Sequence, residues 1–494
     1  MALIVDNEKN YAELMLTVNL FVPNFNDSDL EIFHSTKITS KTVTVNVKIN
    51  NNNYKYRYKT LPCMYKSEQL DNKYLKRYGR VGLYQALSEY TGSVLPWGSL
   101  TGIRPTKLFY EHLKTNSFDE TKDIFRNLYK VSDEKIKIVV DIINHQSKKS
   151  KNNNDIHLYI HIPFCPSKCT YCSFISYSID RYNNLLSEYV NKLIYDIKQS
   201  FAMIRKKNYN LRTIYIGGGT PTILSSENLE ILLSTINAEL KTDSTQKGFA
   251  KEILNKKGAK NKKLFKIIEF TVESGRADTI TQEKLQIMKK HGVTRICVNP
   301  QSFNKEVLKG INRPQNLTET RNAIKWSKEL GFIVNMDLIA GLPGDSFQSF
   351  KQSLTKTLSF KPDNITVHTL AIKNASKLKE TGAEIKNGES VSAMVDYAYR
   401  TLHRHQFFPY YLYRQKHMKE NLENIGYSQT NKECVFNIDS MEEVASIIAC
   451  GSGSISKRLF VESNKIERYA VLRDIPQYME NVKEITARKL NLFK

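Results

Sequence analysis

The sequence predicts an α/β protein whose central part is a parallel sheet built from repeated strand–helix units. Between residues 156 and 380, short runs rich in β-branched residues alternate with longer stretches of helical periodicity. A polar run at residues 146–155 (QSKKSKNNND) holds no apolar residue and is typical of a linker. The 494 residues are enough for about three domains.

We therefore place an N-terminal α+β accessory domain at residues 1–150, the strand–helix region at residues 156–380 and a mainly helical C-terminal domain at residues 381–494. In the first of these, alternating β-branched, aromatic and polar residues predict strands.

The strands expected in the N-terminal domain are Tyr11–Val22 and Thr42–Lys59, followed by a largely helical stretch at Asp71–Leu113. Near the other end of the chain, Met441–Gly453 has the pattern of a helix that ends at a glycine.

The central region contains six strand candidates with helix candidates between them. The strands are His157–Ile162, Arg212–Ile216, Lys266–Val272, Thr294–Val298, Ile333–Ile339 and Asn364–Leu370. The helices are Leu185–Ile204, Glu227–Leu240, Gln282–His291, Leu317–Leu330 and Phe347–Leu358. This order suits an open doubly wound sheet or a barrel or part-barrel. In either arrangement, ligands gather at the carboxyl ends of the strands.

The formal charge of +23 has two interpretations, a surface for nucleic acid or another polyanion, or a lysine-rich bias on a solvated surface. A lysine-rich insert at residues 241–266, which we expect to be a surface excursion, accounts for part of this charge. We therefore do not expect a nucleic-acid partner.

No stretch approaches the ~18 apolar residues of a membrane span, and no basic region precedes the short apolar run at the N-terminus. A cytoplasmic protein is expected.

Three of the seven cysteines are crowded into the motif Cys165-x-x-x-Cys169-x-x-Cys172, directly after the first predicted strand of the central region. The odd number and this spacing argue against a disulfide framework and for a metal site in a reducing compartment. Structural zinc normally needs four closed ligands, and no fourth Cys or His follows nearby, although His161 precedes the motif. A [4Fe–4S] cluster with three thiolates leaves one iron open for a non-protein ligand. The isolated cysteines, expected in cores, are Cys63, Cys297, Cys434 and Cys450.

Two stretches resemble a known family. Tyr159–Cys172 (YIHIPFCPSKCTYC) and Gly217–Pro221 (GGGTP) resemble the radical S-adenosylmethionine (SAM) superfamily, and specifically its oxygen-independent coproporphyrinogen III dehydrogenase (oxidase) branch. The resemblance continues through Val272-Glu273, Pro300–Phe303, Gly310–Arg313 and Asp337–Pro343. Outside the central region, Leu100–Lys107, Tyr411–Lys416 and Asn421–Gly426 resemble the longer HemZ-type subgroup.

This resemblance implies a partial (β/α)6 radical-SAM barrel, with the C-terminal domain covering the substrate. It implies that Cys165, Cys169 and Cys172 hold a [4Fe–4S] cluster whose open iron binds the amino and carboxylate groups of SAM, and that one electron from the cluster cleaves SAM to a 5′-deoxyadenosyl radical. The implied SAM contacts are Tyr159, Tyr171, Gly218, Gly219, Thr220, Glu273, Gln301, Arg313, Asp337 and Ala371. Taken singly, the glycines also suit an ordinary turn, and the carboxylates a solvated surface.

In the resembled family, the radical removes hydrogen from the β-carbon of a substrate propionate. Carbon dioxide and one electron are then lost, and a vinyl group is produced. We accordingly expect a tetrapyrrole substrate, an electron donor and a monomeric enzyme. Because the substrate carries carboxylates around an aromatic macrocycle, a basic and aromatic pocket is expected. Arg414 and Lys416 are the candidates for it, and an amphipathic core segment with basic tips is the alternative.

One position departs from the resembled enzymes. Ser173 and Phe174 follow Cys172, where the dehydrogenases carry a further cysteine two places after the third ligand. Phe174 is found at this place in related haem-handling proteins. A haem-binding or haem-delivery protein is therefore the alternative function, and a radical-SAM enzyme acting on RNA is a third.

Overall fold

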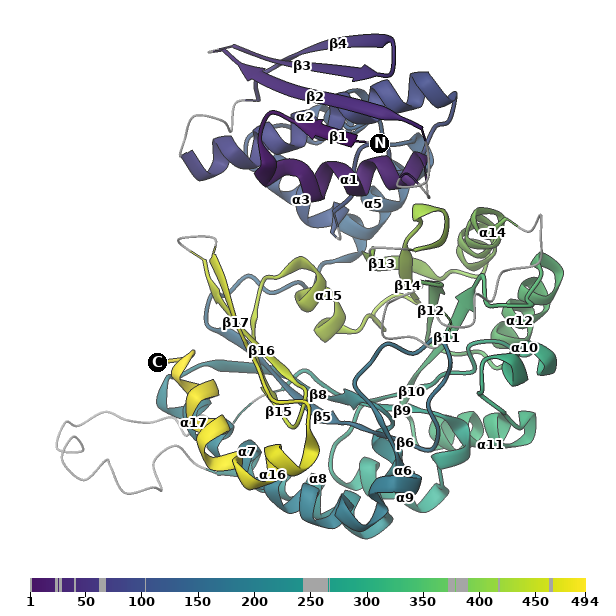
Figure 1. The fold of residues 1–494 in the computed structure, drawn as a ribbon. Coiled ribbons are helices and arrows are strands. Elements are labelled where there is room, and N and C mark those ends of the chain that lie inside the picture. Colours follow the sequence, from purple (N-terminus) through teal and green to yellow (C-terminus); the bar gives the residue numbers. More distant parts are fainter. Residues whose placement is uncertain are drawn as a thin grey trace. The chain divides into compact units, whose positions relative to one another are not determined.

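A computed structural model describes residues 2–22, 25, 29–39, 41–61, 68–102, 104–242, 265, 267–371, 378, 390–415, 418–461 and 465–494. These residues divide into two compact units (Figure 1). The first unit is Met1–Asn144 with Leu412–Glu423, and the second is His145–Tyr411 with Asn424–Lys494.

The first unit contains a four-stranded sheet in the order β1-β2-β3-β4. Its strands are β1 (Ala2–Val5), β2 (Glu31–Ile38), β3 (Thr42–Ile49) and β4 (Asn52–Lys59). Its α-helices are α1 (Tyr11–Phe21), α2 (Glu68–Thr91), α3 (Pro105–His112), α4 (Phe118–Asp123) and α5 (Asp133–His145). Val43, Val45 and Val47 alternate along β3 and pack with residues of α1 and α2 in one buried cluster. The predicted α+β character is confirmed for this unit.

The predicted strand at Tyr11–Val22 is wrong, because this segment forms helix α1. Its buried residues Leu14, Thr17 and Val18 recur at spacings of three and one, which places them on one face of a helix. The apparent two-residue alternation around Thr17 misled the prediction.

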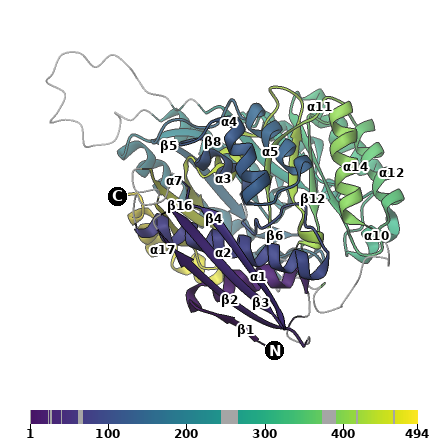
Figure 2. The ribbon, with the colours of Figure 1, turned by 90° about the horizontal axis from the view of Figure 1, so that it is seen from above.

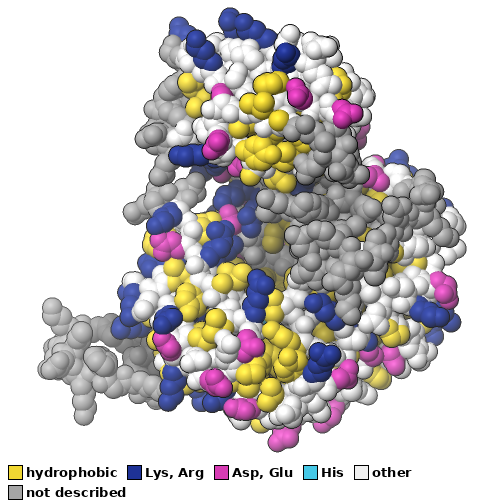
Figure 3. Space-filling model, in the orientation of Figure 1, with side chains coloured by type: hydrophobic (Ala, Val, Ile, Leu, Met, Phe, Trp, Pro, Cys, Tyr) yellow, Lys and Arg dark blue, Asp and Glu magenta, His cyan; other side chains and the backbone are white. Residues whose placement is uncertain are grey.

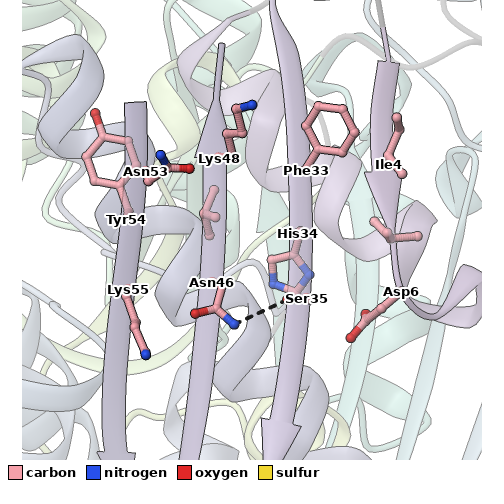
Figure 4. Close-up of a pocket in the computed structure, with 12 residues that line it drawn as sticks. Ile4, Asp6, Phe33, His34, Ser35, Asn46, Lys48, Asn53, Tyr54 and Lys55 are labelled. Carbon is pink, nitrogen blue, oxygen red and sulfur yellow. Dashed lines mark hydrogen bonds between the residues drawn. The ribbon is translucent and has the colours of Figure 1, made fainter. Parts of the chain in front are cut away.

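The other face of this sheet carries exposed side chains, several of which are drawn in Figure 4. Ile4 and Phe33 are 47% and 38% exposed there. The ammonium group of Lys48 lies 5.9 Å from the centre of the Phe33 ring, and Asn46 Nδ2 donates to Ser35 Oγ over 3.4 Å. This face therefore carries a mixture of polar and apolar side chains, in a sheet that packs its buried side on α1 and α2.

The second unit contains an eleven-stranded sheet in the order β13-β14-β12-β11-β10-β9-β8-β5-β15-β16-β17. The pairs from β12 to β15 along this order are parallel, whereas β14, β16 and β17 pair antiparallel. The strands of the parallel part are β5 (Asp155–Ile162), β8 (Asn210–Gly218), β9 (Glu269–Gly275), β10 (Arg295–Val298), β11 (Ile333–Ala340), β12 (Asn364–Thr369) and β15 (Ser446–Cys450). The others are β13 (Phe408–Tyr413), β14 (Asn424–Ser428), β16 (Ile455–Phe460) and β17 (Lys465–Ala470). All six predicted strands are present, in a fold consistent with a partial barrel.

Helices cover the apolar face of this sheet, and Figure 1 shows them on its outside. They are α6 (Ile179–Tyr182), α7 (Leu186–Lys206), α8 (Ser226–Lys241), α9 (Gln282–Lys290), α10 (Lys305–Gly310), α11 (Leu317–Glu329), α12 (Phe347–Ser359), α14 (Val391–Arg404), α16 (Ile475–Glu480) and α17 (Val482–Asn491). Helix α15 (Val435–Glu442) instead lies against the inner face, where Phe436 stacks on Tyr159 and Tyr215. The five predicted helices are therefore confirmed. Figure 2 shows α12 and α14 side by side at one edge.

The strands of the second unit separate apolar from polar side chains. Along β5, Ile156, Leu158 and Ile160 belong to the core shared with the helices. The intervening residues, His157 and Tyr159, point to the opposite face, because successive side chains of a strand alternate. The same alternation on the neighbouring strands makes the inner face polar, and this face carries the candidate site.

The predicted helix at Met441–Gly453 is wrong, because Ser446–Cys450 forms strand β15 beside β5. All five of its residues are buried, and a short, fully buried apolar run has the same hydropathy in a strand as in a helix. Strand β15 adds a seventh parallel strand that the sequence did not predict. The division into units also differs from the predicted separate C-terminal domain, because β14 to β17 extend the central sheet.

The predicted linker is anchored at two points in the second unit. Gln146 is buried and donates to Tyr410 O and to Glu442 Oε1, and the Ser150 N–H donates to Asp439 Oδ1 over 2.7 Å.

Residues 243–264 and 266 of the lysine-rich insert lie outside the described residues, as does Cys63. On the face drawn in Figure 3, Lys and Arg side chains are interspersed with Asp and Glu. Within the described ranges, no helix has the length and apolar character needed to cross a membrane.

A buried ion pair joins the C-terminal helix α17 to α7. Lys489 is fully buried and pairs with Asp196 of α7, which also accepts from Tyr478, Thr486 and the Gly451 N–H. Lys489→Ala should lower the free energy of unfolding by ~3–5 kcal/mol, because a buried carboxylate loses its cation. Urea unfolding measures this change.

The neighbouring residue provides the control. Arg488 is 66% exposed on the same helix and pairs with Glu484. Arg488→Ala should change the free energy of unfolding by about 0.5 kcal/mol or less. Equal effects of the two substitutions would contradict the importance of the buried pair.

Candidate functional site

The three clustered cysteines lie between β6 (Phe164–Cys165) and β7 (Tyr177–Ser178), just after the carboxyl end of β5. Cys169 is buried, whereas Cys165 and Cys172 are partly exposed, and none of them forms a disulfide. The loop is folded back on itself, since the Cys172 N–H donates to Cys169 O over 3.1 Å. It is also tied to the residues after α10, because the Thr170 N–H donates to Ile311 O over 3.0 Å.

Polar donors contact two of the three sulfur atoms. The Thr220 hydroxyl lies 3.5 Å from Cys165 Sγ, and Arg313 Nη1 lies 3.6 Å from Cys169 Sγ. Burial raises the pKa of the Cys165 and Cys172 thiols, and the Thr220 hydroxyl partly opposes this at Cys165. Donors directed at sulfur favour the thiolate, which is the form that binds iron.

The donor set fits a [4Fe–4S] cluster. Three soft sulfur ligands on one short loop are the ligand type that iron–sulfur clusters use. Over the ranges that the structure describes, no three His, Cys, Asp or Glu side chains converge on a point that a single ion could occupy. A cluster requires no such point, because each thiolate binds a different iron atom.

The glycine motif after β8 brings this strand against the cysteine loop. The Gly219 N–H donates to Ile162 O over 2.8 Å, and the Thr220 N–H donates to Phe164 O over 2.7 Å. A Cβ on Gly218 would overlap the His161 ring, and one on Gly219 would overlap the Phe164 carbonyl. Gly218 also has φ = 113°, which L side chains rarely adopt. Gly218 and Gly219, which the resemblance assigns to SAM, are thus also needed for packing within the protein.

Two carboxylates stand at the carboxyl ends of β9 and β11. Glu273 accepts a short hydrogen bond from the Tyr215 hydroxyl at Oε1 and one of 3.3 Å from the Gly218 N–H at Oε2. Burial, reinforced by the charge of Asp337, raises the pKa of Glu273 to about 7, although Tyr215 and Gly218 oppose the shift. Asp337 in turn accepts from Asn335 and lies 3.4 Å from His368 Nε2.

Gln301 lies beside Asp337, and Arg313 lies beside the cysteine loop. Gln301 adopts φ = 66°, and its N–H donates to Asp337 O over 2.9 Å. Its side-chain oxygen is buried without a protein partner, which is a property expected of a ligand-binding amide. Arg313 Nη2 donates to Asn299 O over 2.7 Å and to Gly275 O over 3.1 Å. Burial by itself lowers the pKa of Arg313, but Tyr171 and Cys169 raise it by a larger amount. The pKa is therefore raised overall, and the guanidinium stays charged.

The remaining predicted SAM contacts are near the same strands. Tyr159 lies on β5, Tyr171 packs against the apolar cluster that includes Ile311 and Leu342, and Ala371 follows β12. Direct contacts thus join Thr220 to Cys165, Arg313 to Cys169, and Gly218 to Glu273. Their roles toward SAM stay predictions.

Sequence reasoning missed Tyr215, His368 and Phe436. Tyr215 and His368 face the same way as Glu273 and Asp337 by strand alternation, and this signal was available in the sequence. Phe436 lies on α15, far along the chain, and nothing in the local pattern marks it.

Arg414, predicted to contact the substrate, lies in the first unit and is only 3% exposed. It donates to Leu100 O over 2.5 Å and to Asn421 O over 3.0 Å, and it lies over the Trp97 ring. These contacts occupy its guanidinium inside the first unit. Lys416 lies outside the described residues, so a substrate role for both residues stays a prediction.

Comparison with known proteins gives matches over most of the chain. A family model described as the radical SAM superfamily matches residues 159–356. The chain is 36% identical over 412 residues to the oxygen-independent coproporphyrinogen-III oxidase-like protein HemZ of Bacillus subtilis (strain 168), covering 82% of this chain and 78% of that protein. It is 33% identical over 215 residues to the heme chaperone HemW of the same organism, covering 43% of this chain and 50% of HemW. The solved structure of coproporphyrinogen III oxidase (HemN) from Escherichia coli matches with a TM-score of 0.48 and 17% identity, over 67% of this chain and 70% of that chain.

Removing one thiolate tests the ligand set. After anaerobic reconstitution, the unaltered protein should bind about four iron and four sulfide ions per chain. Cys169→Ala should lose most of both and the visible absorption of the cluster, because two thiolates hold the cluster poorly.

Cys297→Ala is the matched control, since Cys297 is a buried cysteine on β10 that lies outside the Cys165–Cys172 motif. It should retain the full iron and sulfide content. Similar iron content in the Cys169 and Cys297 variants would contradict the ligand assignment.

Proposed function

The chain belongs to the HemZ-type oxygen-independent coproporphyrinogen III oxidase-like family of the radical SAM superfamily, and from this premise we propose that it converts two of the four propionates of coproporphyrinogen III to vinyl groups. The product would be protoporphyrinogen IX. The observation that carries the proposal is the 36% identity to the HemZ protein over 82% of this chain. The contacts that join the cysteine loop to Thr220 and Arg313 support it.

The superfamily uses a [4Fe–4S] cluster and SAM, which together supply one-electron chemistry when bound. Cys165, Cys169 and Cys172 would hold the cluster. The carboxylates of Glu273 and Asp337 suit the ammonium and hydroxyl groups of SAM, and the unpaired amide oxygen of Gln301 adds an acceptor.

The reaction balances if each reacting propionate loses a hydrogen atom from its β-carbon, carbon dioxide and one electron. The hydrogen atom would pass to the radical derived from SAM, and the electron would pass to a one-electron acceptor. An electron donor must also reduce the cluster. The proposal includes a cytoplasmic location, which the free cysteines support because thiols persist in reducing compartments.

Haem binding without turnover is the second candidate. The 33% identity to a heme chaperone over 43% of this chain supports it. Phe174, two residues after Cys172, is 67% exposed, which leaves an apolar side chain beside the cysteine loop available to a hydrophobic ligand.

Product analysis tests the enzymatic proposal. Reconstituted protein incubated anaerobically with SAM, dithionite, an electron acceptor and coproporphyrinogen III should release carbon dioxide and form vinyl product, detected by chromatography and mass spectrometry. Cys169→Ala should form none. Cleavage of SAM without any vinyl product would overturn this function.

Haem titration of the same preparation separates the second candidate. A stoichiometric haem complex, observed by absorbance in protein that forms no vinyl product, would favour haem delivery. Absence of a haem complex together with vinyl product would remove it.

A further inference from the structure

Tyr215 connects the Glu273 carboxylate to the interior of the second unit. It lies on β8, is 7% exposed, and its hydroxyl donates the short hydrogen bond to Glu273 Oε1. Its ring stacks on that of Phe436 with 4.4 Å between centroids and 25° between planes. The Tyr159 ring also stacks on both of these rings, with 6.0 Å between its centroid and that of Tyr215 and 6.1 Å to that of Phe436.

The position of Phe436 is fixed because α15 is held at its beginning. The Glu269 carboxylate accepts from the Val435 N–H over 2.9 Å, from the Phe436 N–H over 3.3 Å and from Cys434 Sγ over 3.2 Å. A carboxylate at a helix N-terminus satisfies N–H groups that have no partner within the helix. Arg295 lies 3.4 Å from Glu269 and keeps this buried carboxylate paired.

The same helix is held further along by Asp439. Its Oδ2 lies 3.0 Å from Arg212 Nε and 3.2 Å from His157 Nε2, and its Oδ1 accepts from the Ser150 N–H. Strands β5, β8, β9 and β10 therefore all contribute partners to α15 or to the residues at its start. The Phe436 ring therefore has little freedom to move, and the same holds for the Tyr215 ring that stacks on it.

Glu273 depends on Tyr215 for its strongest partner. Its other donor, the Gly218 N–H, is 3.3 Å away. The titratable groups that act on Glu273 or on which it acts are Tyr215 on β8, Asp337 on β11, His368 on β12, Tyr159 on β5 and Cys297 on β10. Asp337 disfavours a second negative charge beside it, so Glu273 needs donors to remain ionised.

We propose that Tyr215 is a positioning residue that holds the Glu273 carboxylate for SAM, and that Phe436 extends this role to α15. The identity of the ligand rests on the proposed function, whereas the hydrogen bond and the ring stack do not. Through Phe436 on α15, the C-terminal region of the chain thereby contributes to cofactor binding. A purely structural role for Tyr215 would instead affect stability and leave the pH dependence of binding unchanged.

Binding of S-adenosylhomocysteine, a SAM analogue that cannot be cleaved, tests the proposal. Its dissociation constant is measured by anaerobic calorimetry on cluster-loaded protein between pH 6 and pH 9. In Tyr215→Phe the ring remains but the donor is lost, so the pKa of Glu273 rises above its present value of about 7. A rise of about one unit reduces the ionised fraction at pH 7 from about one half to about one tenth. The dissociation constant should then rise about five-fold at pH 7, with a smaller change at pH 9.

Tyr478→Phe is the matched control. Tyr478 is also a buried tyrosine of the second unit whose hydroxyl donates to a carboxylate, Asp196, over 3.2 Å. It should bind the analogue with the pH profile of the unaltered protein. An unchanged midpoint in Tyr215→Phe, or an equal loss at every pH, would overturn the role of Tyr215.

Phe436→Leu tests the part assigned to α15. It removes the ring stack and retains an apolar side chain, so the pH midpoint of binding should move in the same direction by less than in Tyr215→Phe. A midpoint at the unaltered value would overturn this part. Because no tetrapyrrole is present, these results do not depend on whether vinyl product forms, and the two proposals fail separately.

Discussion

The close approach of the end of β8 to the loop after β5 is the contact on which the candidate site depends. Gly218 and Gly219 allow it, because a side chain at either position would overlap His161 or Phe164. Once the two segments meet, Thr220 reaches Cys165, and the Gly218 N–H reaches Glu273. A single glycine-rich turn therefore joins the cysteine loop to the carboxylates at the strand ends.

The alternation of side chains along parallel strands explains how so polar a site is accommodated. One face of each strand contributes Ile, Leu and Val to the core beneath the helices, while the other faces inward with His, Tyr, Glu, Arg and Asp. The charged groups at the base of this inner face are paired, as in Glu269 with Arg295 and Asp439 with Arg212. Such pairs cost desolvation and add little net stability, but they fix where α15 begins and how it lies.

The sequence was sufficient for the central sheet, whereas the roles that it suggests for the residues of the candidate site stay predictions. Strand–helix alternation identified six parallel strands, and the spacing of the cysteine motif after the first of them indicated a metal site. Glu273 and Asp337 were identified through the family resemblance. The prediction of secondary structure failed for Tyr11–Val22 and for Ser446–Cys450, where a short pattern of apolar residues suits helix and strand equally. The stack of Phe436 on Tyr215 could not be predicted, since it depends on where a distant helix docks.

The central claim is that three cysteines hold a cluster with one iron left open for SAM. Electron paramagnetic resonance of the reconstituted, dithionite-reduced protein tests it directly. We expect a [4Fe–4S]⁺ signal whose g values shift when SAM is added, because SAM would bind the open iron. A signal of full intensity that SAM leaves unchanged would contradict the account.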